Sequence, residues 1–154
     1  MEVEDCCLAF AVDATALERL LADGEIGAYR DANPWFVAAE RLEAARSRGR
    51  VLVALLASGT PLRLSRWAEI LDIEVHALAS TRETRVRFGR AGAVNPLFET
   101  LDSVTLLPAE HRLERERREG LRTRRQHLDP SELSPYALCE TPPFLRTLPD
   151  PAKT

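Results

Sequence analysis

The stretch VLVALLASGTPLRLSRWAEILDIEVHALASTRETRVRF, residues 51–88, decides the fold of this chain. Its first part, residues 51–57, is uninterrupted apolar sequence and predicts a buried strand. Residues 58–61 (SGTP) predict a turn, because serine, glycine and proline favour turn conformations. Residues 62–78 and 84–88 predict two further strands, the second of them from its alternating apolar pattern. The stretch therefore predicts consecutive strands of one sheet.

The long strand predicted over residues 62–78 carries a break in its alternation. Leu64, Ala68 and Ile70 fall on one face of a regular strand, whereas Ile73 and Val75 continue on that face only after a slip of one residue. A β-bulge produces such a slip and bends the strand. The pattern therefore predicts a small, strongly curved sheet or a barrel.

The elements outside this stretch follow from the same signals. Asp13 or Thr15 can cap a first helix, and Asn33 followed by Pro34 predicts the start of a second helix. Strands before two helices, followed by further strands, favour an α+β fold over a parallel βαβ sheet. The predicted elements are a strand at 7–12, a helix at 15–23, a loop at 24–32, a helix at 34–48 that ends at Gly49, a strand at 101–107 and a charged helix at 109–127.

Length and composition indicate one soluble domain. The chain has 154 residues, 45% hydrophobic and 29% charged, which is ordinary for a globular protein. We expect a single α+β domain over residues 1–128 and a proline-rich extension over 129–154, whose last residues are predicted to be disordered. The acidic N-terminus does not resemble a secretory signal, and no apolar run is long enough to span a membrane, so we expect a cytoplasmic protein.

The three cysteines, Cys6, Cys7 and Cys139, agree with that compartment. Their number is odd, and adjacent cysteines rarely bridge each other, so we expect buried, reduced thiols. A bridge from Cys139 to the first strand stays open as an alternative. Neither the cysteines nor His76, His111 and His127 show metal-ligand spacing. The chain also lacks a nucleophile elbow, a phosphate-binding loop and a dinucleotide fingerprint. We therefore predict no metal, no cofactor and no catalytic residue.

The few aromatic residues suggest a ligand site. Trp35 lies at the start of the second predicted helix, close in sequence to Tyr29, Arg30 and Asn33. Trp67 lies in the long strand that follows the turn containing Ser58 and Thr60. Tryptophan beside polar loops can stack on a planar ligand such as a nucleobase. The alternative is that both tryptophans fill the core.

Arginine dominates the basic residues. The chain has 21 basic residues, and all but Lys153 are arginine, although the net charge is −3. Seven arginines lie in the predicted helix at 109–127, where they could contact phosphates; the four chosen as backbone contacts are Arg115, Arg118, Arg122 and Arg125. The glutamates interleaved with them can equally neutralise the arginines within the helix.

Three segments resemble the PUA-like β-barrel superfamily, which includes the EVE and ASCH domains: VLVALLASG at 51–59, WAEILDIEV at 67–75 and TRVRF at 84–88. The resemblance covers residues 51–107. It implies a curved barrel with a pocket beside the strand that follows the turn, and binding of RNA or of a modified nucleobase. Only Ser58, Thr60 and Trp67 have matching positions in that pocket.

Two classes of function follow, with a third alternative. The first is a non-enzymatic domain that binds nucleic acid or a modified nucleobase. The second is a protein–protein interaction or regulatory module that uses the charged helix and the proline-rich tail, in a homodimer or with another partner. The third is a helix-turn-helix over residues 67–83, which would place Thr81, Arg82 and Arg85 on DNA.

Overall fold

The computed structural model describes residues 2–22, 28–78, 81–107, 133 and 135–148. These residues form an α+β fold around one six-stranded mixed sheet with the strand order β2-β5-β4-β3-β1-β6. The strands are β1 Cys6–Ala11, β2 Ala28–Asp31, β3 Leu52–Ser58, β4 Arg63–Leu78, β5 Thr81–Ala93 and β6 Ala137–Glu140. The helices are α1 Ala14–Ala22 and α2 Phe36–Ser47, and the described chain adds three short 3-10 turns, η1 Pro96–Phe98, η2 Leu101–Ser103 and η5 Pro143–Leu145.

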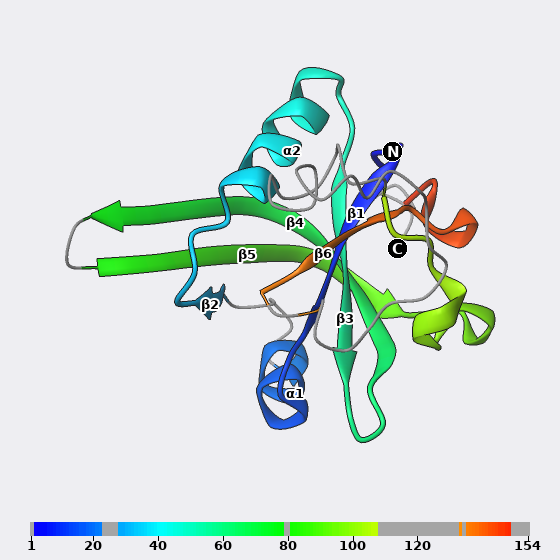
Figure 1. Ribbon diagram of the computed structural model, residues 1–154. Helices are drawn as coiled ribbons and strands as arrows, with labels where there is room; N and C mark the ends of the chain where they lie inside the picture. The colour runs from blue at the N-terminus through cyan, green and yellow to red at the C-terminus, as the bar shows by residue number, and fades with distance from the viewer. Residues whose placement is uncertain (1, 23–27, 79–80, 108–132, 134, 149–154) are drawn as a thin grey trace, which may run out of the picture.

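The sheet is open, because β2 and β6 lie at its two edges. The expectation of a closed barrel is therefore wrong for the described residues, whereas a small curved sheet is compatible with them. Only β1 and β3 pair in parallel, through a connection that contains both helices; every other neighbouring pair is antiparallel. Figure 1 shows the β4–β5 hairpin projecting away from β1, β3 and β6.

The predicted bulge in the long strand is confirmed. The register between β4 and β5 shifts twice between Ala68 and Asp72, so Ile70 and Ile73 face the same core although their spacing is odd. A further register shift, between β4 and β3 near Leu56, was not predicted. It places Leu64 on the opposite face from Ala68, since the two residues belong to different core clusters. Residues 67–78 and 81–83 thus lie in β4 and β5, and the helix-turn-helix alternative is wrong.

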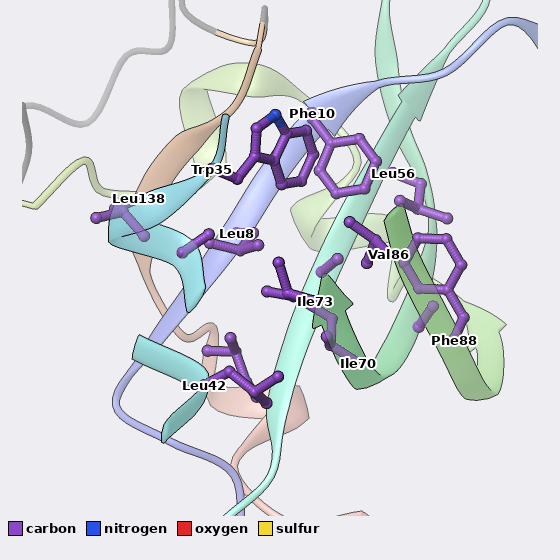
Figure 2. Close-up of a cluster of buried hydrophobic side chains, with 14 of the residues drawn as sticks. Leu8, Phe10, Trp35, Leu42, Leu56, Ile70, Ile73, Val86, Phe88 and Leu138 are labelled. Carbon is purple, nitrogen blue, oxygen red and sulfur yellow. The ribbon is translucent and has the colours of Figure 1, made fainter. Parts of the chain in front are cut away.

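Both faces of the central strands are buried, which explains why β3 is apolar throughout. One face packs against Ala38, Leu42 and Ala45 of α2, and Figure 2 shows the resulting cluster with Leu42 near Ile70 and Trp35 beside Phe10. The other face packs against the C-terminal half of the chain, whose buried residues there are Val94, Val104, Leu106, Leu133, Leu145 and Leu148. The sheet therefore separates two cores.

The helix ends confirm two of the sequence predictions and correct a third. Asp13 accepts a hydrogen bond from the Ala16 N–H at 3.1 Å and so caps α1, one of the two predicted caps. Asn33 does not cap α2, which begins at Phe36. The Thr84 hydroxyl of β5 instead accepts from the Trp35 N–H at 3.0 Å. Gly49, at a φ of 68°, follows the end of α2 as predicted.

Three further segments differ from prediction. The predicted loop at 24–32 contains β2, whose four residues pair with β5. The predicted strand at 101–107 is wrong: η2 occupies its start, and only Leu106 bridges to Cys139. The proline-rich extension contributes β6, a strand that was not predicted and that pairs antiparallel with β1. The charged helix predicted at 109–127 lies outside the described residues.

Candidate functional site

The structure brings four of the predicted site residues together around Asp31. Tyr29 and Arg30 lie on β2, and Asn33 and Trp35 follow it. The Asp31 carboxylate accepts hydrogen bonds from Trp35 Nε1 at 2.6 Å and from Asn33 Nδ2 at 3.2 Å. The rings of Tyr29 and Trp35 lie with their centroids 6.0 Å apart.

Trp35 is fully buried within this group. Its ring contacts Phe10 at a centroid distance of 5.1 Å and Tyr136 at 4.7 Å, in the aromatic arrangement expected of a core. Its backbone N–H and its indole N–H both have partners, Thr84 and Asp31. This position matches the alternative that Trp35 fills the core. Ligand stacking on Trp35 stays a prediction, and it requires a movement that exposes the ring.

Arg30 is exposed at the surface, with 61% of its side chain accessible. Its Nε lies 3.8 Å from the Glu83 carboxylate, and its position on β2 is opposite Arg85 of β5. Like charges opposite each other on neighbouring strands are unfavourable, so Glu83 stabilises this pair of arginines. Arg30 could contact an anion at the surface, independently of Trp35.

The remaining predicted residues, Ser58, Thr60 and Trp67, lie apart from this group. Trp67 is half-buried against the opposite core cluster from Trp35, so the structure does not bring the two tryptophans into one site. Ser58 is opposite Arg63 whereas Trp67 is opposite Leu55, which separates them by about 10 Å along the strands. The Ser58 and Ser65 hydroxyls hydrogen-bond each other at 2.9 Å, and Thr60 is exposed in the turn. Arg115, Arg118, Arg122 and Arg125 lie outside the described residues.

A cavity of about 650 Å³ lies at another place, where the segment before β1, the C-terminal half of α2 and the segment after β6 meet. Arg41 and Arg48 reach it from α2 and its C-terminus, and Arg146 reaches it from the segment after η5. We call it the arginine pocket. Three carboxylates also line it, Glu4, Asp5 and Glu140, together with Cys6, Thr141 and the apolar Val3 and Leu107.

Glu4 is the electrostatic centre of the arginine pocket, because its side chain is only 3% exposed. One carboxylate oxygen lies 2.6 Å from the Arg48 guanidinium. The other accepts from the Asp5 N–H at 3.0 Å and lies 3.4 Å from the Arg50 guanidinium. A buried carboxylate needs such partners, since an unpaired charge would be expensive to bury. Glu4 thereby fixes two arginines at one end of the sheet.

The backbone around Glu4 explains why these residues meet. The Glu4 N–H donates to the Val51 carbonyl at 2.7 Å, and the Thr141 hydroxyl donates to the Glu4 carbonyl at 2.5 Å. The Val3 N–H donates to the Arg146 carbonyl at 3.0 Å. One end of the sheet therefore contains the start of β1, the start of the parallel β3 and the end of the antiparallel β6. Helix α2 also ends there.

The chemistry available in the arginine pocket is that of ion binding. Burial raises the pKa of the Cys6 thiol, an effect that the charge of nearby Arg41 partly offsets. A thiol with a raised pKa is a weak nucleophile at neutral pH. The guanidiniums, by contrast, present paired N–H donors to phosphate or carboxylate.

Sequence reasoning missed this pocket. The available signal was an acidic segment, Glu2 to Asp5, directly before β1, and an arginine cluster directly before β3. Those two clusters become neighbours only if β1 and β3 are adjacent and parallel. The order of the predicted elements had favoured an α+β fold over a parallel βαβ sheet.

Comparison with known proteins gives no matching family model, no matching curated protein and no matching solved structure. Within the described ranges, no three histidine, cysteine or acidic side chains gather as metal ligands. No helix in the described part of the chain is long and apolar enough to cross a membrane.

Proposed function

We propose that this chain is a non-enzymatic binding domain whose arginine pocket holds the phosphate of a nucleotide-like ligand, either free or at the end of a single strand. One observation carries the proposal: Arg41, Arg48 and Arg146 converge on a cavity of about 650 Å³. Cavities of roughly 300–1,000 Å³ are typical of small-molecule sites. Several guanidiniums around such a cavity favour a planar, multiply charged anion.

The ion pairs of the arginine pocket support this assignment. Arg48 is held by Glu4 at 2.6 Å, so its position is fixed before a ligand arrives. Arg146 is exposed and takes part in none of the ion pairs among the described residues, which leaves its charge available. Asp5 and Glu140 add carboxylates, which accept hydrogen bonds from the N–H groups on the edge of a base.

Two features of the sequence support a nucleotide over other anions. The resemblance of residues 51–107 to the PUA-like superfamily implies a ligand with a nucleobase. In addition, Leu107 lines the arginine pocket, and the stretch that contains Arg115, Arg118, Arg122 and Arg125 follows it in the chain. We propose that these arginines contact the backbone phosphates of a bound polynucleotide.

Calorimetric titration of the full chain tests the proposal, with guanosine monophosphate and guanosine as one pair of ligands. A single-stranded oligonucleotide with and without a 5′-phosphate forms the second pair. We expect the phosphorylated member of each pair to bind at least about tenfold more tightly, since a hydrogen bond to a charged group contributes roughly 1.5–3 kcal/mol. The affinity should fall as salt is added. Equal binding of both members of both pairs would refute the proposal.

Variants localise the binding site. Arg41→Gln and Arg146→Gln should each weaken binding of guanosine monophosphate by about tenfold, whereas Arg63→Gln is the matched control. Arg63 is exposed at the start of β4 and does not line the arginine pocket. If all three variants weaken binding equally, the interaction is non-specific attraction to arginine and the pocket is not the site.

A further inference from the structure

Cys7 and Cys139 lie directly opposite each other on the neighbouring strands β1 and β6. Both side chains belong to the same core cluster, so both point to the same face of the sheet. Both residues are fully buried, and neither takes part in a disulfide bond. Cys6, the neighbour of Cys7, belongs to the cluster on the opposite face. The fold therefore selects one of the three possible cysteine pairs.

The spacing of such a pair is close to that of a disulfide. Directly opposite residues of an antiparallel pair have Cα atoms about 4.5–5.5 Å apart, within the roughly 4.4–6.8 Å that a disulfide spans. Their Cβ atoms lie about 4.5–5.5 Å apart, against the roughly 3.5–4.5 Å of a bridge. β6 has four residues, and its outer side is bridged only by residues 105–107, at Leu106 to Cys139, so a shift of about one ångström toward β1 has to move only this short segment with it.

We propose that Cys7 and Cys139 form a redox pair that closes under peroxide and fastens β6 to β1. One sulfur, as thiolate, attacks a peroxide oxygen and becomes a sulfenic acid, and the first water leaves. The second sulfur then displaces the hydroxyl of the sulfenic acid, which leaves as the second water. Overall, two thiols and one hydrogen peroxide give one disulfide and two waters.

The bridge would act on the arginine pocket, a consequence that rests on the proposed function. Cys6, before Cys7, lines the pocket, as do Glu140 and Thr141, directly after Cys139. The Thr141 hydroxyl and the Glu4 carbonyl already join these two walls. A covalent link beside them would hold both walls in place, and a wall fixed in its bound position favours binding.

Burial makes the reduced pair slow to react. It raises the pKa of the Cys7 thiol well above its ordinary value, with the neighbouring Cys139 as the next contribution. The Cys7 thiol also faces the Glu140 carbonyl at 3.8 Å as a weak hydrogen-bond donor. We therefore expect the reduced state to persist in a reducing compartment and the bridge to form over minutes to hours under peroxide.

Thiol counting on the full chain tests the pair without any ligand. The folded protein is treated with hydrogen peroxide, denatured, and titrated for free thiols with and without dithiothreitol. We expect the count to fall from three to one and to return to three on reduction. Mass spectrometry should show the peptide of Cys7 joined to that of Cys139. The Cys6→Ala variant should still form this bridge, whereas Cys7→Ala and Cys139→Ala should not.

A count that stays at three, or a bridge from Cys6 to Cys139, would overturn the proposed pair. The wild-type chain and the Cys6→Ala variant decide this point even if the other variants fail to fold. Guanosine monophosphate is then titrated into the reduced and the bridged wild-type chain. Tighter binding by the bridged form supports control of the pocket, and equal binding by both forms refutes it. If neither form binds, the proposed function fails while the redox pair stands on its own data.

Discussion

Two buried groups of the molecule, one around Trp35 and one around Glu4, are stabilised by different physics. The Trp35 group joins Phe10, Tyr29 and Tyr136 through ring contacts, the closest with centroids 4.7 Å apart. The Glu4 group is held by charge, through Arg48 and Arg50. Burying aromatic surface stabilises a fold directly, whereas a buried ion pair roughly cancels its own desolvation cost. Stability alone therefore explains the Trp35 group but not the Glu4 group, and this difference favours a binding role for the arginine pocket.

The largest effect is expected from Trp35→Ala, which tests whether the Trp35 group stabilises the core. Trp35 is fully buried, so its removal should cost about 3–5 kcal/mol of the free energy of unfolding. Urea unfolding followed by circular dichroism measures the loss, and Trp35→Phe, which keeps an aromatic ring, should lose less. A cost below about 1 kcal/mol for Trp35→Ala would mean that the ring does not support the core, and stacking on a ligand would become the better explanation of this residue.

Glu4→Gln should lower the free energy of unfolding by less than Trp35→Ala. The arginines that it leaves unpaired can recover water, because 51% of the Arg48 side chain and 30% of the Arg50 side chain are exposed. We expect a cost of about 1–3 kcal/mol, the usual range for an imperfectly satisfied buried polar group. Arg48→Gln should cost less than Glu4→Gln, because Glu4 keeps Arg50. The same urea titrations decide this, and the opposite order would show that Arg48 carries the group.

The sequence predicted the fold well where a signal was local. The apolar run of β3, the turn after it, the bulged β4 and both helices follow from periodicity and turn residues near each other in the chain. β2 was missed because its four residues carry no apolar run, and they pair as a strand only because β5 offers an edge. β6 was missed because prolines surround it, although its residues Ala137, Leu138 and Cys139 are buried against β1.

The candidate site was harder to predict because its residues are distant in sequence. Glu4, Arg48 and Thr141 meet only through the parallel β1–β3 pair and the return of the chain at β6. Residue type also misled: tryptophan suggested a ligand platform, yet Asp31 and Thr84 satisfy the polar groups of Trp35 within the core. Pairing between distant segments decides where the arginine pocket forms and whether Trp35 is buried, and a single sequence carries little information about such pairing.

Gly92→Ala extends the comparison to the second tryptophan. A Cβ at position 92 would lie 2.8 Å from Trp67 Nε1 and 2.9 Å from its Cε2, so the indole must move. Because Trp67 is half-buried and can shift, we expect a cost of about 1–2 kcal/mol, at the low end for overpacking. Fluorescence in a Trp35→Phe background should report a more exposed indole. An unchanged spectrum and stability would show that Trp67 does not rest on Gly92 in solution.

The smallest expected effect is a loss of stability at high pH, which comes from the two tyrosines of the Trp35 group. Burial raises the pKa of Tyr29, and the charge of Asp31 adds to this; burial also raises the pKa of Tyr136. The folded state therefore favours the neutral phenols, and their contribution to stability is complete below about pH 10, where unfolded tyrosine ionises. As pH rises through the folded pKa, this contribution is lost.

We therefore expect the free energy of unfolding in urea to fall as the pH rises above about 10, and to fall less in Tyr29→Phe. Tyr29 is the better residue to change, because the Tyr136 hydroxyl accepts a hydrogen bond from the Ala38 N–H at 3.1 Å and its loss would disturb α2. The cysteines titrate alike in the wild type and in Tyr29→Phe. The difference between the two slopes of the free energy of unfolding against pH therefore isolates the contribution of Tyr29. Identical slopes would mean that the Tyr29 phenol is solvated in the folded protein, and that the Trp35 group is more open to a ligand than its packing indicates.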